Sequence, residues 1–453
     1  MIRAATLTLA AALALAAAPA GAQTSPPPTR AAKPGTPTKP RTQPAPKPAA
    51  KPGGRAQSAC VKCHQQVTPQ IVQDWRLSRH AVSEVGCETC HGEAHRSKDD
   101  VAKALLPNPE TCAQCHEQQV AQFKKGKHAL AWAAVKAMPT FHYQPVAIRE
   151  GLKGCGGCHK IGLKSEAEQK ELEQVSGGYG NASCDACHTR HLFSKAEARR
   201  PEACQTCHMG FDHPQWEMYS SSKHGVRNAL VQQGVLPEGT AAPTCQTCHM
   251  QEGNHEVRTG WGFLAVRLPF PEDDPQWKAD RITILQGLGV LDPKGNPTAR
   301  LDAVKAADVA RLTQQAFDVE RKKMLATCNR CHAAGFASEQ LRQSESLLRD
   351  ADHLMAEAIR TVAGLYQDGT LPKPKDYAFA FPDLLTFHDA PTPVEQQLFV
   401  MFLEHRMRAF QGAFHANPDY ANWYGWSEMR RDLVEIQHAA EEMRRVKGMG
   451  AKK

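Results

Sequence analysis

The pentapeptide Cys-x-x-Cys-His occurs eight times in this 453-residue chain, and the eight copies use all sixteen of its cysteines. Two residues three apart on a helix are separated by a rise of only about 4.5 Å, so both thiols face the same way. The pattern is typical of a c-type haem attachment site, in which the thiols bond the porphyrin and the histidine binds the iron. The cysteines are Cys60, Cys63, Cys87, Cys90, Cys112, Cys115, Cys155, Cys158, Cys184, Cys187, Cys204, Cys207, Cys245, Cys248, Cys328 and Cys331.

The eight motif histidines are His64, His91, His116, His159, His188, His208, His249 and His332. A disulfide framework would not need a histidine after every second cysteine. Zinc ribbons use paired Cys-x-x-Cys segments, but they do not need that histidine either. Because no cysteine is left over, we interpret the chain as an octahaem cytochrome c with eight covalently bound haems.

The first 57 residues differ in composition from the rest of the chain. Residues 1–22 combine a lone Arg3 with an apolar Ala/Leu run and a small-residue end, which predicts a secretory signal peptide. Residues 23–57 contain ten prolines and predict an extended, disordered spacer. No later stretch has 18 uninterrupted apolar residues, so we expect no transmembrane segment in the mature chain. We therefore expect a periplasmic protein, exported across the inner membrane of a bacterium.

The net charge of +8 comes from this N-terminal part, because residues 1–57 contain eight Lys or Arg residues and no acidic residue. The remaining chain is balanced, with 47 basic and 47 acidic residues. This balance gives no support to a nucleic-acid partner.

The remainder is expected to be mainly α-helical, in two parts. Residues 58–335 show poor apolar periodicity and predict an octahaem domain of short helices and long loops, with the haems as its core. Residues 336–453 predict a C-terminal antiparallel bundle of long helices. Apolar residues recur there at three- and four-residue steps, first between Leu341 and Leu365, then after Pro393, and again from Met429 to Met443.

Thirteen further histidines are candidates for the eight distal positions on the irons. Segments 74–80, 122–128 and 217–224 form an internal repeat that ends in a basic residue and a histidine: His80, His128 and His224. His95, His191 and His255 lie close after a motif, and His353 or His142 is expected to supply a seventh ligand. His388, His405, His415 and His438 are assigned structural roles. An iron with two histidine ligands suits electron transfer, whereas an open sixth position binds a small molecule.

The chain resembles the octahaem hydroxylamine oxidoreductases. The resemblance lies in the long gap before the last motif, in the terminal helices and in three short segments, residues 154–159, 207–216 and 417–425. The resemblance implies a homotrimer whose catalytic haem is bound by Cys155, Cys158 and His159. The other seven haems would pass electrons to a soluble or membrane-attached cytochrome c. One departure is that residues 225–365 contain no tyrosine, so any distal phenol expected there is missing or replaced.

The resemblance also implies the catalytic residues for a small nitrogenous substrate. Asp212 and His213 match the family's acid–base pair, with His191 as the rival. Tyr420 or Tyr424 would cross-link the catalytic haem of a neighbouring subunit. The expected activity is hydroxylamine oxidation to nitric oxide or nitrite. Two alternatives remain: reduction of nitrite or hydroxylamine to ammonia, and a pure electron-transfer conduit with every iron saturated.

Overall fold

Helices supply the regular structure of this protein, with no strand in any segment that the structure describes. The computed structural model describes residues 58–137, 154–176, 182–210, 212–258, 267–306, 313–373, 381–386 and 389–450. These residues belong to one compact unit, Ala50–Lys453. The mainly α-helical prediction is confirmed. The signal peptide, the spacer, His142 and His388 lie outside the described residues.

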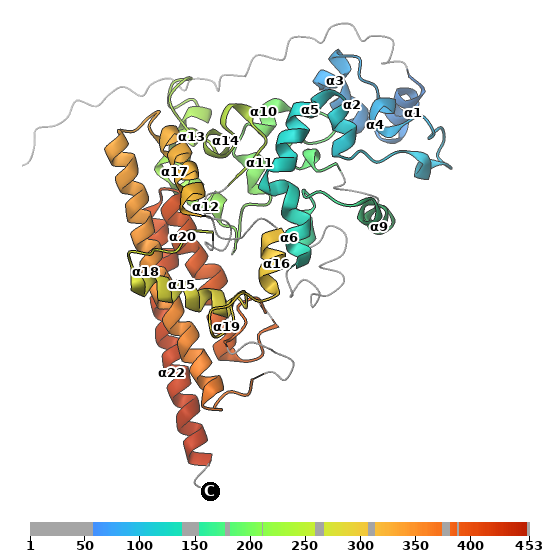
Figure 1. Ribbon diagram of the computed structural model, residues 1–453. Helices are drawn as coiled ribbons and strands as arrows, with labels where there is room; N and C mark the ends of the chain where they lie inside the picture. The colour runs from blue at the N-terminus through green and yellow to red at the C-terminus, as the bar shows by residue number, and fades with distance from the viewer. Residues whose placement is uncertain are drawn as a thin grey trace, which may run out of the picture. The chain divides into compact units, whose positions relative to one another are not determined.

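The motif-rich half consists of short helices joined by loops (Figure 1). Three of them, α4, α8 and α14, coincide with a motif, so the motif itself folds as one helical turn. The elements are α1 (Ala59–Val67), α2 (Pro69–Leu77), α3 (Arg79–Val82), α4 (Cys87–His91), η2 (Val101–Lys103), α5 (Pro109–Lys125), η3 (Lys127–Leu130), α6 (Ala131–Ala137), α8 (Cys155–His159), α9 (Glu166–Ser176), η5 (Cys184–Ala186), α10 (Lys195–Ala198), α11 (Glu202–Gln205), α12 (Gln215–Ser221), α13 (Lys223–Gln232), α14 (Cys245–His249) and η6 (Gln251–Gly253).

Apolar packing within this half is sparse. One cluster joins Val61, Val72 and Trp75, and another joins Trp132, Val135 and Leu172. Clusters of this size bury too little apolar surface to stabilise so long a segment. Its stability must therefore come from groups other than apolar side chains.

Longer helices make up the C-terminal part. They are α15 (Pro275–Gly287), α16 (Arg300–Ala306), α17 (Gln314–Cys328), α18 (Ala334–Gln367), α19 (Pro393–Val400), η8 (Met401–His405), α20 (Arg406–Phe414), α21 (Pro418–Tyr420), η9 (Ala421–Trp426) and α22 (Ser427–Gly450). Helix α18 begins directly after the last motif, seven residues earlier than the apolar stripe alone indicated. None of the described helices is both long and apolar enough to span a membrane.

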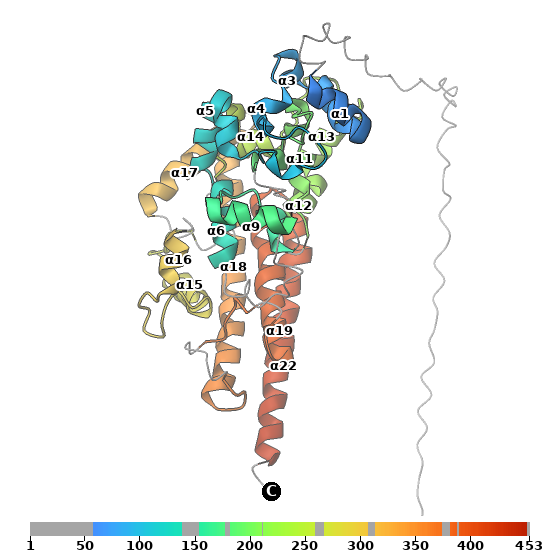
Figure 2. The ribbon, with the colours of Figure 1, turned by 90° about the vertical axis from the view of Figure 1, so that its right-hand side faces the viewer.

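Helix α18 runs antiparallel to the continuous rod α19–η8–α20. Ser344 near its start donates a hydrogen bond to the carbonyl of Ala413, and Tyr366 near its end bonds Glu395. The rod in turn runs antiparallel to η9–α22. Helices α18 and α22 lie side by side (Figure 2). The long C-terminal helices therefore pack together, as predicted.

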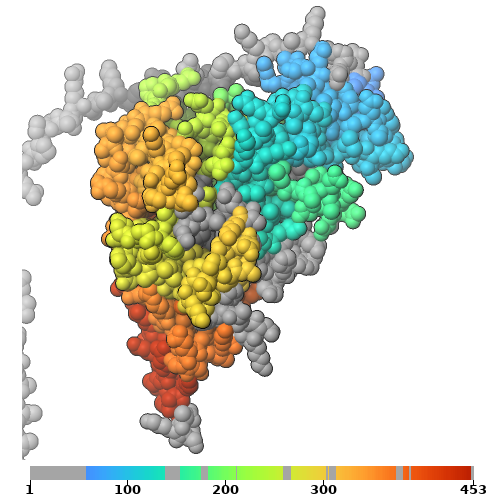
Figure 3. All heavy atoms as spheres, in the orientation of Figure 1, coloured from blue at the N-terminus to red at the C-terminus, as the bar shows by residue number. Residues whose placement is uncertain are grey.

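One large apolar core holds these helices. Met355, Ile359 and Phe402 are fully buried in it, and Ile284 of α15 joins it from before residue 336. Close backbone approach sets one position: a Cβ on Gly425 would lie 2.3 Å from the backbone nitrogen of Ala409, so η9 can reach α20 only with glycine there. In the space-filling view the motif-rich half (blue to green) and the C-terminal helices (yellow to red) occupy different parts of the surface (Figure 3).

A buried ion pair lies within the bundle. Arg406 bonds Asp352 at 2.6 Å, and the two side chains are 1% and 0% exposed. The indole nitrogen of Trp277 donates a further hydrogen bond to Asp352 at 2.9 Å. Both charges thus have partners, as buried charges require.

Candidate haem-binding site

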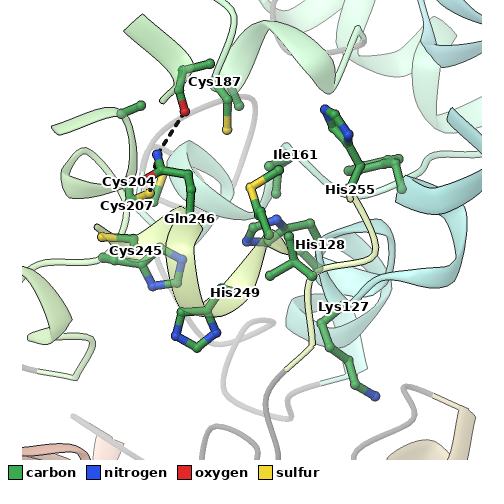
Figure 4. A pocket seen from close by; sticks show the side chains of 18 of the residues that line it. Lys127, His128, Ile161, Cys187, Cys204, Cys207, Cys245, Gln246, His249 and His255 are labelled. Atoms are coloured by element: carbon green, nitrogen blue, oxygen red, sulfur yellow. Dashed lines mark hydrogen bonds between the residues drawn. The ribbon is translucent and has the colours of Figure 1, made fainter. Parts of the chain in front are cut away.

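All eight motifs line one continuous cavity of about 4790 Å³. Divided among eight motifs, this is about 600 Å³ each, within the range of about 300–1,000 Å³ typical of a single cofactor pocket. Figure 4 shows one part of it, where His128, His249 and His255 gather with cysteines of three motifs. The volume of this cavity agrees with the prediction that cofactors form the core of the motif-rich half.

Seven of the motif histidines each face one further histidine across this cavity. Their ring centres are 6.0–6.4 Å apart. The pairs are His64 with His95, His91 with His191, His116 with His80, His188 with His255, His208 with His128, His249 with His415, and His332 with His224.

This separation fits an iron between the two rings. Two metal–imidazole bonds of about 2 Å each, plus the distance from each nitrogen to its ring centre, span about 6 Å. Direct stacking of two imidazoles would not hold seven pairs at so constant a distance. The residues present therefore fit haem with two axial histidines.

The other ring nitrogen of several motif histidines is engaged in a hydrogen bond. Nδ1 of His91 bonds the carbonyl of Leu105 at 2.9 Å, that of His159 bonds the carbonyl of Ala131 at 2.8 Å, and that of His64 bonds the Thr68 hydroxyl at 2.8 Å. The two carbonyl acceptors fix the proton on Nδ1 of His91 and His159 and leave Nε2 for the metal, and the Thr68 hydroxyl can accept from His64 in the same way.

Burial keeps many of these rings neutral, which is the form that binds iron. Burial lowers the pKa of His128 to about 4, and it does the same for His415. The pKa of His208 falls to about 3, through burial first and then through the neighbouring His128 and His213. Neutral imidazole is the ligand form, so the three rings are ready for a metal without losing a proton.

The internal repeat seen in the sequence is a repeated structural unit. In each copy one helix stops, a cap residue takes an extended conformation, and the histidine is the second residue of the next helix. The caps Ser78, Gly126 and Ser222 have nearly equal backbone angles, with φ of −76°, −82° and −75°. The unit places His80, His128 and His224 opposite motif histidines of three different haem sites.

The structure places His353 elsewhere. Its Nδ1 lies 2.9 Å from Asp280 and its Nε2 lies 3.5 Å from Glu357, so within the described chain it takes part in a charge network on α18. The residue opposite His249 is His415, at the end of α20. Sequence reasoning assigned His415 a structural role, because it follows no motif closely. The feature of the sequence that could have drawn attention to His415 is its place at the end of a predicted helix, directly before Ala416 and Asn417.

His159 of the fourth motif has a different neighbour. Among the described residues, the ring that faces it is His213, at 6.4 Å and nearly perpendicular. His213 is also 6.3 Å from His208, which already faces His128. Nδ1 of His213 lies 2.9 Å from Asp212. The rival His191 faces His91 instead.

Asp212 is held in its charged form. Burial alone would raise the pKa of Asp212, but the hydrogen bond and the charge of His213 outweigh it, so the pKa is lowered. The structure thus brings a carboxylate and an imidazole together beside His159, the arrangement that orients a general base.

Tyr420 and Tyr424 lie together on the surface of this chain. Their ring centres are 5.0 Å apart, and Tyr424 is 57% exposed. Within the described residues, neither of them lines the cavity. The Tyr424 side chain is therefore exposed on this chain and is not part of the described cavity wall.

The cysteines give the order in which the motifs adjoin. Cysteines of the first and second motifs lie near one another, as do those of the second and third, the third and fifth, the fifth and sixth, the sixth and seventh, and the seventh and eighth. The fourth motif adjoins the sixth, because Sγ of Cys158 lies 3.9 Å from the carbonyl oxygen of Thr206. The motifs therefore form a row with the fourth as a branch.

The row of paired histidines and thiols defines a class, the multihaem c-type cytochromes. Residues 83–267 and 300–377 match the family described as "Seven times multi-haem cytochrome CxxCH", and residues 35–92 match cytochrome c554 and c-prime. The chain belongs to the multihaem cytochrome family, and it carries multiple covalent c-type haems. Within that class it is related to the proteins that resemble hydroxylamine oxidoreductase.

The relatives agree with this placement. A probable nitrite reductase–hydroxylamine oxidoreductase fusion protein of Kuenenia stuttgartiensis is 26% identical over 86% of this chain and 52% of its own. The chain thus spans about half the length of this relative. The C-type polyheme cytochrome OmcB of Geobacter sulfurreducens is 29% identical over 29% of this chain and 19% of its own.

The fold is also similar to solved structures. A structure of the reducing HAO-like protein complex of Kuenenia stuttgartiensis matches with a TM-score of 0.61 and 25% identity, covering 87% of this chain and 86% of that one. A hypothetical multiheme protein matches with a TM-score of 0.60 and 19% identity, over 88% of this chain and 98% of that one, which shows a shared fold.

Proposed function

We propose that the protein is a periplasmic oxidoreductase with eight haems that oxidises hydroxylamine at the haem of the fourth motif. The other seven haems pass the electrons to a cytochrome c. One observation carries this proposal: seven motif histidines each have a dedicated partner imidazole, whereas the described neighbour of His159 is shared with a second site.

The sharing of His213 supports an open position at His159. An axial ligand is committed to one iron, but His213 is nearly equidistant from His159 and His208. We assign His415, and not His353, as the distal ligand at the seventh motif, because it faces His249. With the six distal histidines from the sequence, seven irons are then saturated.

The haem at this site supplies one-electron redox chemistry when it is bound. Hydroxylamine loses protons together with electrons, so the site needs a proton acceptor. Nε2 of His213 would take the proton, while Asp212 holds the opposite nitrogen and stabilises the resulting imidazolium. Cys155 and Cys158 would hold the haem covalently beside this pair.

The two tyrosines, Tyr420 and Tyr424, support oxidation over reduction of the substrate, because the resemblance links a tyrosine cross-link on the catalytic haem to the family's oxidative members. We propose that Tyr420 or Tyr424 reaches the fourth haem of a neighbouring subunit in a homotrimer, because Tyr424 faces outward. Replacing both tyrosines with Phe is expected to remove any modified-haem absorption band and to slow oxidation more than reduction. Trp423→Phe, a change to a neighbouring exposed side chain, is the matched control and should leave the band intact. An unchanged spectrum in the double variant would dismiss the cross-link.

Reduction of nitrite or hydroxylamine is the second candidate, because a structurally similar complex is described as reducing. Steady-state assays with artificial electron carriers in both directions separate the two. We expect faster turnover with hydroxylamine and an oxidised carrier. Faster turnover with nitrite and a reduced carrier would reverse the assignment.

Electron paramagnetic resonance tests the proposal as a whole. The expected result is one ferric centre whose signal changes when hydroxylamine is added, beside seven that do not respond. If every centre is low-spin and indifferent to small nitrogen compounds, the protein is an electron conduit.

A further inference from the structure

The sixth motif holds its histidine by a side-chain amide. Nδ1 of His208 lies 3.3 Å from Oε1 of Gln215. In contrast, His91 and His159 use backbone carbonyls, which no substitution can remove. A substitution of Gln215 can therefore change the hydrogen bond at His208.

Gln411 decides which end of the Gln215 amide faces His208. Nε2 of Gln215 donates a hydrogen bond of 2.9 Å to Oε1 of Gln411, which is only 4% exposed. With its amide nitrogen engaged there, Gln215 presents its amide oxygen to His208. An acceptor at this position requires His208 to carry its proton on Nδ1 and leaves Nε2 for the iron.

Several contacts hold this arrangement in place. The backbone nitrogen of Trp216 donates to the carbonyl of His208 at 2.9 Å, so the loop returns Gln215 to its own motif. Asn417 bonds the carbonyl of Met218 and the hydroxyl of Ser221, which fastens the C-terminal helices to α12. The amide pair is therefore positioned by both halves of the fold.

Gln411 also serves the neighbouring haem site. Nδ1 of His415 bonds the carbonyl of Gln411 at 2.7 Å, and His415 faces His249 of the seventh motif. One residue of α20 thus contacts a ligand histidine of the seventh site directly and one of the sixth through Gln215.

We propose that Gln215, positioned by Gln411, sets the reduction potential of the haem at His208. A stronger acceptor at Nδ1 makes the imidazole more basic and stabilises the oxidised iron, which lowers the potential. A neutral amide at 3.3 Å is a modest acceptor and keeps the potential higher than a carboxylate would. Both glutamines are positioning residues, since they act through His208.

The consequence for turnover rests on the proposed function. The sixth motif lies against the fourth, with Sγ of Cys158 3.9 Å from the carbonyl oxygen of Thr206 and with His213 beside both His159 and His208, so its haem would be the first to receive each electron from the catalytic haem. One iron loses an electron and the other gains it, and no bond is made or broken. A higher potential at the acceptor favours this transfer.

Redox titration of the intact holoprotein, followed by electron paramagnetic resonance, tests the assignment with two opposed variants. Gln215→Glu is expected to lower one midpoint and Gln215→Met to raise it. Each should change the ratio of reduced to oxidised haem at a fixed potential about tenfold, which is about 59 mV for a one-electron couple. Gln411→Met should shift the same haem in the direction of Gln215→Met by a smaller amount.

The same substitutions at Gln276, on α15 and outside the described cavity lining, provide the matched control and should move no midpoint. Haem content per chain must stay complete in every variant. The assignment is overturned if both Gln215 variants leave all midpoints unchanged, or if both shift one haem in the same direction, as a packing change would. If the wild type does not oxidise hydroxylamine but the opposed shifts appear, the proposed function fails and the assignment stands.

Discussion

The motif-rich helices α1–α14 and the C-terminal helices α15–α22 are stabilised by different means. Among the residues that the structure describes, the C-terminal helices share one apolar core of 25 buried residues and a smaller cluster of four, whereas the motif-rich helices have two clusters of three. The cavity that all eight motifs line lies where an apolar core would otherwise be. The fold of the C-terminal helices is therefore stabilised by apolar side chains, and the fold of the motif-rich helices depends on the groups that the cysteine motifs attach.

The largest expected effect comes from withholding haem. In a chain produced without haem attachment, we expect residues 58–258 to lose their fold, because their own apolar clusters are too small to stabilise it. The C-terminal helices should persist. Limited proteolysis followed by mass spectrometry should find a resistant fragment that includes residues 334–450. Equal resistance of both halves would mean that the motif-rich half folds without its cofactors.

Replacing His213 with Ala should affect activity and leave stability nearly unchanged. Loss of a general base typically slows turnover about 10²–10⁴-fold. Steady-state oxidation of hydroxylamine, with haem content as a check, measures this. The exposed His438 of α22 offers a control, and His438→Ala should turn over normally. Wild-type rates in the His213 variant would assign the proton to another acceptor.

The C-terminal helices should respond in the opposite way, with a loss of stability. Arg406→Met removes the closer of the two buried cations around Asp352 and leaves Arg281 at 3.6 Å, so the expected loss of unfolding free energy lies below the about 3–5 kcal/mol of a buried charge with no partner. Urea unfolding followed by circular dichroism measures the change. The double variant with Asp352→Leu should recover only part of it, because buried Arg281 then loses the same carboxylate and keeps its hydrogen bond to the carbonyl of Leu268. No change in the single variant would show that the ion pair adds nothing to the bundle.

The smallest effect is expected at the exposed contact between α18 and α22. Hydrogen bonds from Thr370 and Arg444 lower the pKa of Asp368 to about 2, below its usual value of about 3.9. Its contribution is therefore present above about pH 4 and lost as the pH falls through 2. Asp368→Asn should melt slightly below the wild type at pH 7, with a difference that shrinks as the pH is lowered towards 2. A difference that grows on acidification would contradict this assignment.

The sequence predicted the C-terminal helices well because their signal is local. The stripe from Leu348 to Leu365 is buried on one face of α18, as its spacing indicated. The start of this helix was missed, because Ala334 to Gln340 lack an apolar period. Leu341 and Leu347 belong to the stripe but line the cavity.

The histidines that face motif histidines in the structure were predictable only where they lie near a motif in the chain or belong to the repeat. The repeat led to His80, His128 and His224, which all face motif histidines. His415 could not be found in this way, because α20 brings it to His249 from 166 residues away. His353 lies on a strongly periodic helix, which made it conspicuous, yet the charged Asp280 accounts for it.

The branch at the sixth motif has a consequence for the paths that electrons can take through the protein. A centre that joins a row at an inner member has two outlets, one through the fifth, third and second motifs to the first, and one through the seventh to the eighth. Cys63 in the first motif and Cys331 in the eighth are exposed, but so are Cys115 in the third and Cys155 in the fourth. An electron that enters at the fourth motif can thus move along either of two arms, and one arm can hold an electron while the other passes one on.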